Sequence, residues 1–213
     1  MYDIIGDIHG HASRLECLLR KLGYDYDGRS WRHSERQVIF VGDFFDRGPE
    51  QVETYHLVRT MLDRGAALAV MGNHEFNAVS YAMPDPNQPD ETLRPRTEKN
   101  IREHASFLAQ VGEDSVLHQE IIAWCKDLPL YIDLKGLRVV HACWDYQALQ
   151  TLEELIDKEQ RLRPWAWAAA ALKGSEAHDA VETCLKGLEI NLPNGATFVD
   201  KGGVERRSIR TRW

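Results

Sequence analysis

The sequence predicts an α/β protein in which short parallel strands alternate with helices. Three apolar runs, at residues 2–5, 37–41 and 67–71, are each followed by a polar segment that contains glycine and then by a helical pattern. This repeated order is typical of parallel strands joined by helical crossovers. With 213 residues and a hydrophobic content of 43%, the chain is long enough for one substantial core. We therefore expect a single domain over residues 1–213.

The other elements are predicted from hydrophobic periodicity and from turn residues. Helical patterns cover residues 12–22, the segment after Pro49, residues 98–111, residues 115–126 and most of residues 151–188. Two strands are expected at residues 129–134 and 136–143, around a Lys135-Gly136 turn. Residues 83–97 are rich in proline and are expected to form a loop. A hairpin around residues 201–203 is expected within residues 197–213.

The composition argues against two kinds of partner. A formal net charge of −7 is opposite in sign to the surface that nucleic-acid-binding proteins present. No apolar stretch approaches the roughly 20 residues of a membrane span, and the N-terminus lacks the pattern of a signal peptide. The four cysteines are scattered, which is typical of a reducing compartment. We expect a cytoplasmic protein that binds neither nucleic acid nor membrane.

Polar side chains with metal-binding chemistry follow several of the predicted strands. They are Asp7 and His9 after the first strand, Asp43 after the second, Asn73 and His74 after the third, and His141 at the end of a later one. Because the carboxyl ends of parallel strands lie at one edge of a sheet, these side chains are expected to converge. A single Asp or His at a strand end is more often a turn residue, but three such blocks together favour a shared site.

Carboxylate, amide and imidazole groups are suitable ligands for manganese, iron or zinc, whereas the lack of thiolates argues against a structural zinc site. Two cations about 3.5–4 Å apart repel each other, so an anion is needed between them. Asp43 or a hydroxide can supply that anion. The hydroxide is also the expected nucleophile, since coordination lowers the pKa of water from about 15.7 towards about 7.

The three blocks resemble the motifs of the phosphoprotein phosphatase (PPP) family of calcineurin-like metallophosphoesterases, which read GDxHG, GDxxDRG and GNHE. Here the segments are GDIHG at residues 6–10, GDFFDRG at 42–48 and GNHE at 72–75. VVHACW, at residues 139–144, resembles a later family strand that ends in a metal-binding histidine. The resemblance implies a four-layer α/β sandwich, with two mixed β-sheets flanked by helices.

By this resemblance, the cofactors would be two divalent metal ions, Mn²⁺ first, with iron, zinc or nickel as alternatives. Asp7 and His9 would bind the first ion, and Asn73 and His141 would bind the second. Asp43 would bridge the two ions.

The same resemblance implies the residues that act on the substrate. His74, oriented by Asp46, would protonate the leaving oxygen, because a carboxylate beside an imidazole raises its pKa and fixes its tautomer. Arg47 would bind two phosphate oxygens through its planar guanidinium group. Asn73 and His74 would also contact the substrate.

Two parts of the family pattern have no clear counterpart. The family has a further metal-binding histidine, but His178 lies in a predicted helix and is not expected to be a ligand. A second phosphate-binding arginine is also unassigned, and its candidates lie on a basic strand that would ordinarily be a solvated face: Arg206, Arg207, Arg210 and Arg212. We expect either that the chain ends before the last family segment or that the second metal has fewer protein ligands.

Three functions are compatible with these features. The first is a phosphomonoesterase of the serine/threonine protein phosphatase type, acting on phosphorylated protein or a small phosphate compound; Glu75, in the third block, favours it. The second is a diadenosine tetraphosphatase or related nucleotide pyrophosphohydrolase. The third is a catalytically weak metal- or phosphate-binding module. Arg94 and Arg96, in the predicted loop, are expected to line the substrate approach.

Overall fold

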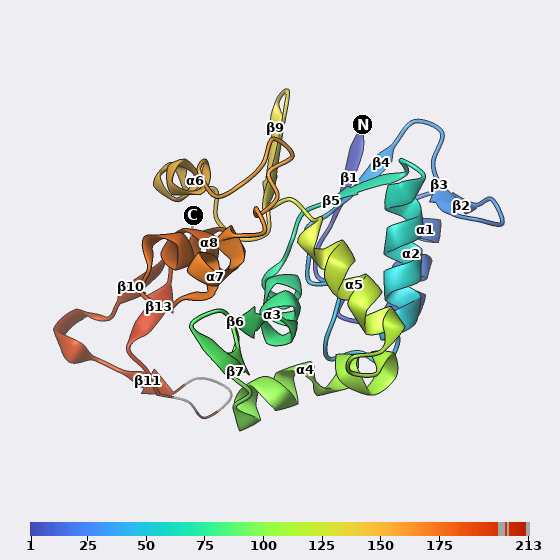
Figure 1. Cartoon of the computed structure of the whole chain (residues 1–213). Helices are drawn as coiled ribbons and strands as arrows, with labels where there is room; N and C mark the ends of the chain where they lie inside the picture. The colour runs from blue at the N-terminus through green and yellow to red at the C-terminus, as the bar shows by residue number, and fades with distance from the viewer. Residues whose placement is uncertain (200–202, 204, 212–213) are drawn as a thin grey trace.

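A three-stranded parallel sheet with the order β1-β4-β5 lies at the centre of the molecule (Figure 1). The computed structural model describes residues 1–199, 203 and 205–211. The strands are β1 (Tyr2–Ile5), β4 (Gln37–Phe40) and β5 (Ala67–Ala69). Val38 lies in register between Asp3 and Ala67, so all three strands end at the same edge. The predicted α/β class and its parallel strands are confirmed.

Two crossover helices cover one face of this sheet. α1 (Ala12–Lys21) buries Leu15 and Leu19, and α2 (Gln51–Asp63) buries Val58 and Met61. Within each helix the two side chains are three or four positions apart, so they lie on one face and pack against the sheet. Figure 1 shows both helices on the same side of the strands.

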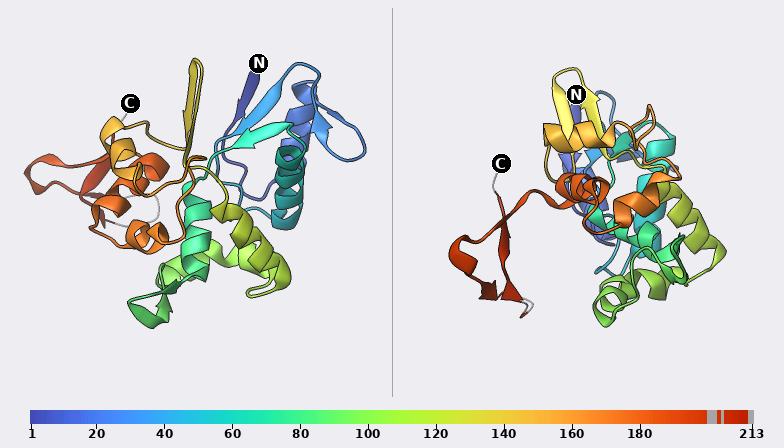
Figure 2. Two further views of the ribbon diagram at one scale, coloured as in Figure 1. Left: turned by 45° about the horizontal axis from the view of Figure 1, so that its top comes forward. Right: turned by 60° about the vertical axis from the view of Figure 1, so that its left-hand side comes forward.

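A β-hairpin covers the opposite face. β8 (Tyr131–Leu134) and β9 (Leu137–Val140) pair antiparallel around the predicted turn. Val139 of this hairpin packs against Ile39 and Val70 of the parallel sheet. α6 (Tyr146–Leu152) lies beyond the hairpin (Figures 1 and 2). The resulting order of layers is α6, the hairpin, the parallel sheet, and the pair α1 and α2.

This order matches the predicted four-layer sandwich, but the strand content of the layers differs. Among the described residues, one sheet is wholly parallel and the facing one is a two-stranded antiparallel hairpin, so neither is mixed. The connections explain the difference. Helical crossovers permit only parallel neighbours in the first sheet, and the two-residue turn between β8 and β9 permits only antiparallel pairing.

Three helices pack below the strand ends in the view of Figure 1. They are α3 (Asn73–Ala82), α4 (Glu98–Val111) and α5 (Val116–Lys126). Thr97 and Ser115 accept hydrogen bonds from the first turns of α4 and α5, which fixes where these helices begin. Trp124 of α5 packs against Phe44 and Phe45, which joins the helices to the loop after β4.

Two predicted segments differ from the structure. Residues 83–97 contain a short hairpin, β6 (Pro84–Asp85) with β7 (Gln88–Thr92), rather than a structureless loop. β7 is almost entirely exposed, so its sequence lacks the alternation of apolar and polar residues that would predict a strand. Residues 151–188 are helical only in part: after α6, an irregular segment with an Ile156–Leu162 bridge precedes α7 (Ala166–Ala171) and α8 (Glu176–Lys186).

Short strands form the remaining sheets. Near the N-terminus these are β2 (Asp25–Tyr26) and β3 (Trp31–Arg32), and near the C-terminus β10 (Glu189–Asn191), the 3₁₀ turn η1 (Pro193–Gly195), β11 (Phe198–Val199), β12 (Glu205–Arg206) and β13 (Ser208–Arg210). β11 and β12 pair antiparallel, as predicted for a hairpin there, although turn residues 201 and 202 lie outside the described residues. β13 pairs with β10 instead of extending that hairpin.

Within the described ranges, no helix is both long and apolar enough to cross a membrane. Three of the four cysteines are buried, and Cys17 is exposed.

Candidate metal centre

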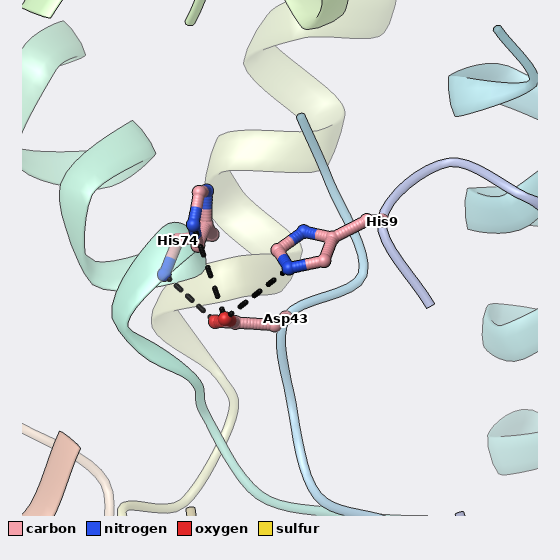
Figure 3. A group of neighbouring side chains, drawn as sticks. All are labelled: His9, Asp43 and His74. Carbon is pink, nitrogen blue, oxygen red and sulfur yellow. Dashed lines mark hydrogen bonds and ion pairs between the residues drawn. The ribbon is translucent and has the colours of Figure 1, made fainter. Parts of the chain in front are cut away.

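Asp43 lies at the centre of a cluster built from the segments that follow β1, β4, β5 and β9. Its Oδ1 is 3.6 Å from His141 Nε2, and its Oδ2 is 3.7 Å from His9 Nε2 and 3.9 Å from His74 Nε2. Figure 3 shows His9 and His74 approaching this carboxylate from two sides. Asp43 belongs to two groups of potential ligands, one with His9 and His74 and the other with Asp7 and His141. In each group the ligand atoms lie within 4.8 Å of one another. A carboxylate shared in this way can bridge two cations.

Backbone carbonyl groups orient two of the histidines. His9 Nδ1 lies 2.8 Å from the Phe45 oxygen, and His141 Nδ1 lies 2.5 Å from the Val41 oxygen. With the proton on Nδ1, the Nε2 lone pair of each ring faces Asp43. His9 Nε2 is buried and has no hydrogen-bond partner among the described residues, and burial lowers the pKa of His9, which favours the neutral ring. A divalent cation fits here, because it would satisfy both the orphaned nitrogen and the carboxylate.

The loops that carry these residues pack backbone against backbone. The amide groups of Ile8 and His9 donate to the Asp43 carbonyl oxygen at 3.0 and 2.9 Å. A Cβ on Gly72 would lie 2.4 Å from the Asp43 nitrogen, so glycine is needed for this approach. Non-glycine residues with left-handed backbone gather here: His9 (φ 48°), Asp43 (φ 55°), Asp46 (φ 68°) and Arg47 (φ 70°). Since this conformation costs roughly 1–2 kcal/mol per residue, tertiary contacts must impose it.

Glu75 is fully buried and ties two of these loops together. Its carboxylate accepts hydrogen bonds from the backbone amides of Asp43, Phe44 and Gly72 at 2.8, 2.8 and 2.9 Å. Burial raises the pKa of Glu75 to about 7, although two of these donors act in the opposite direction. The side chain is 0% exposed and cannot contact a substrate. Glu75 therefore has no direct contact through which it could distinguish one substrate from another.

Replacing Glu75 by glutamine is expected to destabilise the fold. Glutamine has one acceptor oxygen where the carboxylate has two, so at least one buried amide loses its partner. The expected loss is about 1–3 kcal/mol in the free energy of unfolding, measured in urea. The matched control is Glu91→Gln, on the exposed strand β7, for which a change below about 0.5 kcal/mol is expected. Equal stability of the two variants would contradict the role given to Glu75.

Asp46 joins His74 to a second histidine, His104 of α4. Its Oδ2 is 2.5 Å from His74 Nδ1 and its Oδ1 is 2.8 Å from His104 Nδ1. Burial lowers the pKa of His74, but the hydrogen bond to Asp46 and the charge of Asp43 outweigh it, so this pKa is raised. The structure thus brings His74 and Asp46 together as predicted. His104, buried and stacked on Phe107, was missed, because it lies inside a helix 58 residues from Asp46 with no motif around it.

Arg47 and Asn73 lie where the cluster opens into a cavity of about 720 Å³. Arg47 is exposed, and its Nη2 is 3.5 Å from His74 Nε2. Asn73 is the first residue of α3 and lines the same cavity. All eight predicted site residues therefore gather in one region, with Asp7 the most exposed of the carboxylates at 57% of its side chain.

Of the remaining candidate residues, some line this cavity and others do not. Arg94 lines it, whereas Arg96 instead pairs with Glu113 at 2.6 Å, so only one of the two arginines expected at the substrate approach lies there. His178 lines the cavity from α8, and its Nδ1 lies 3.0 Å from the Ala170 oxygen, away from Asp43 and its neighbours. Two candidates from the basic strand, Arg206 and Arg210, also line the cavity, and Arg212 lies outside the described residues.

Comparison with known proteins identifies a family and several relatives. A family model described as calcineurin-like phosphoesterase matches residues 2–166. The chain is 33% identical over 141 residues to the asymmetrical bis(5'-nucleosyl)-tetraphosphatase PrpE of Oceanobacillus iheyensis. This alignment covers 66% of this chain and 54% of that protein. It is 45% identical over 141 residues to the protein of the same name from Geobacillus thermodenitrificans, with coverage of 66% and 55%. The chain thus spans about half the length of the curated relatives it matches.

Among solved structures, that of a cold-active protein-tyrosine phosphatase from a psychrophilic Shewanella species aligns with a TM-score of 0.49. The identity is 17%, over 85% of this chain and 51% of that chain.

Proposed function

This chain belongs to the calcineurin-like phosphoesterase family, whose members use divalent metal ions, and we propose that it hydrolyses the phosphate chain of a dinucleoside tetraphosphate. The observation that carries the hydrolytic part is Asp43, whose two carboxylate oxygens face different sets of potential ligands. The names of the curated relatives favour the dinucleotide over a phosphorylated protein, which was the first of the three functions considered.

In this proposal, Asp7 and His9, whose Oδ2 and Nε2 lie 3.7 Å apart, would hold one divalent ion. Asn73 and His141 would hold a second, and Asp43 would be a ligand to both. When bound, such ions lower the pKa of a coordinated water and polarise the phosphoryl group. Carboxylate, amide and imidazole ligands suit Mn²⁺, our first choice, as well as iron, zinc or nickel. His9 Nε2 supports this assignment most directly, because it is buried without a partner among the described residues.

The remaining residues bind phosphate and move a proton. Arg47 is exposed at the cavity and binds oxygens of the scissile phosphate through its guanidinium group. His74 donates one N–H to Asp46 and the other to the leaving oxygen, since its raised pKa favours the doubly protonated ring. His104 is a positioning residue, because it holds the second oxygen of Asp46 and so fixes the carboxylate that orients His74.

A substrate panel tests the proposal. With saturating Mn²⁺, we expect two bound metal ions per chain by elemental analysis and hydrolysis of diadenosine tetraphosphate to ATP and AMP. Its kcat/KM is expected to exceed those of p-nitrophenyl phosphate and a phosphopeptide by at least about tenfold. A preference for the phosphopeptide would restore the protein phosphatase function. One tightly bound metal with negligible hydrolysis of all three compounds would instead indicate a binding module.

A further inference from the structure

The cavity beside His74 has a charge opposite to that of the chain as a whole. Eight lysine or arginine side chains and three glutamates line it, an excess of five positive charges in a chain with a net charge of −7. It runs from Arg47 and Asn73 to α4, α7, α8 and the C-terminal strands. We call it the basic cavity. Positive charges gathered in a recess concentrate the electric field and attract anionic ligands.

Basic partners within the cavity neutralise its three glutamates. Glu103 contacts Arg94 at 2.7 Å and Lys99 at 3.7 Å. The other two pairs are Lys186 with Glu182 at 2.6 Å and Arg210 with Glu189 at 3.7 Å. These pairs use four of the eight basic side chains, so four of the five surplus positive charges belong to the others.

Arg102 and Lys173 carry part of this surplus. Both are exposed, and neither has an ion pair among the residues that the structure describes. Arg102 is on α4 and Lys173 follows α7, so they reach the basic cavity from two separate elements. Long cationic side chains with free donors are suited to phosphate oxygens.

Arg94 fixes the wall that carries Arg102. Its guanidinium group donates to Asn77 of α3, to Asn100 at 3.0 Å and to Glu103 at 2.7 Å, the last two on α4. These bonds join α4 to α3, the helix that begins with Asn73 and His74. The position of the α4 segment that carries Arg102, relative to the candidate metal centre, is thus set by a partly buried polar network.

We propose that Arg102 and Lys173, on a wall fixed by Arg94, form a subsite for the phosphate groups of a polyphosphate chain beyond the group being cleaved. This inference rests on the proposed function for the nature of the ligand. A monoester carries a single phosphate, and that phosphate is bound by Arg47 and the metal centre. Only a longer phosphate chain extends from His74 into the basic cavity, so the subsite selects polyphosphates over monoesters.

The test uses the double variant Arg102→Ala/Lys173→Ala and inorganic tripolyphosphate as the probe. The matched control is Arg14→Ala/Lys21→Ala, which removes two exposed charges from α1, outside the basic cavity. Binding of tripolyphosphate to the Mn²⁺-loaded chain is measured by titration calorimetry, with a titration into the same metal-containing buffer to subtract chelation. We expect the Kd to rise at least about tenfold in the cavity variant and to stay within about twofold in the control.

A second measurement separates this subsite from the proposed function. The cavity variant is expected to raise the KM for diadenosine tetraphosphate at least about tenfold, with turnover of p-nitrophenyl phosphate unchanged within about twofold. Equal tripolyphosphate affinity in the two double variants, or no binding by the unaltered chain, would overturn the subsite. If tripolyphosphate binds as expected but the dinucleotide is not cleaved, the subsite holds and the proposed function fails.

Discussion

Replacing His74 by alanine is expected to lower kcat by about 100- to 10,000-fold, the usual contribution of a general acid. His74 is the histidine whose Nδ1 is held by Asp46 and whose Nε2 faces the Arg47 guanidinium group. The loss is expected to be larger for an alkyl phosphate than for p-nitrophenyl phosphate, because nitrophenolate leaves without needing a proton. Metal content, measured by elemental analysis, is expected to remain that of the unaltered chain.

The metal measurement is decisive, because His74 Nε2 also lies 3.9 Å from the Asp43 carboxylate and could itself be a ligand. Loss of metal in His74→Ala would show that His74 is a metal ligand and not the general acid. The matched control is His178→Ala, which removes a second imidazole that lines the same cavity and contacts the Ala170 oxygen. It is expected to keep most of its turnover.

Replacing Asp43 by alanine is expected to remove both metal ions and abolish hydrolysis. Without the carboxylate, two cations in this cluster would repel each other with no anion of the chain between them. Elemental analysis after exhaustive dialysis measures the metal content, and circular dichroism checks that the chain remains folded. Asp25→Ala, an exposed position on β2, is expected to retain the metals.

A companion variant separates charge from backbone conformation. Asp43 has a left-handed backbone, which asparagine tolerates better than alanine. Asp43→Asn is therefore expected to fold at least as well as Asp43→Ala and still to lose metal, because it lacks the negative charge. Two metal ions retained in Asp43→Ala would show that another group bridges them.

The convergence of the candidate ligands could be predicted from the sequence because these residues occupy the ends of strands. Asp7, His9 and Asp43 follow β1 and β4, which pair in parallel and end at one edge. Convergence then follows from the topology alone. His141 was also expected at a strand end, but it follows β9, in a different sheet, so its position beside Asp43 depends on how that hairpin packs against the parallel sheet.

The basic cavity and His104 could not be predicted in the same way. His104 is one of several polar residues on a helix, and its contact with Asp46 depends on how α4 packs against the loop after β4. The cavity combines α4, α8 and the C-terminal strands, whose charges are far apart in the sequence. A net charge of −7 conceals this local excess of positive charge, because composition does not record where side chains lie.

The left-handed backbone of His9, Asp43, Asp46 and Arg47 sets a limit on how robust this fold can become. Glycine would adopt the same conformation with no steric penalty. Relief of backbone strain alone would therefore favour glycine at these positions, and the imidazole, carboxylates and guanidinium group would disappear with it. In these loops, low backbone strain and the proposed hydrolysis make opposing demands on the same residues.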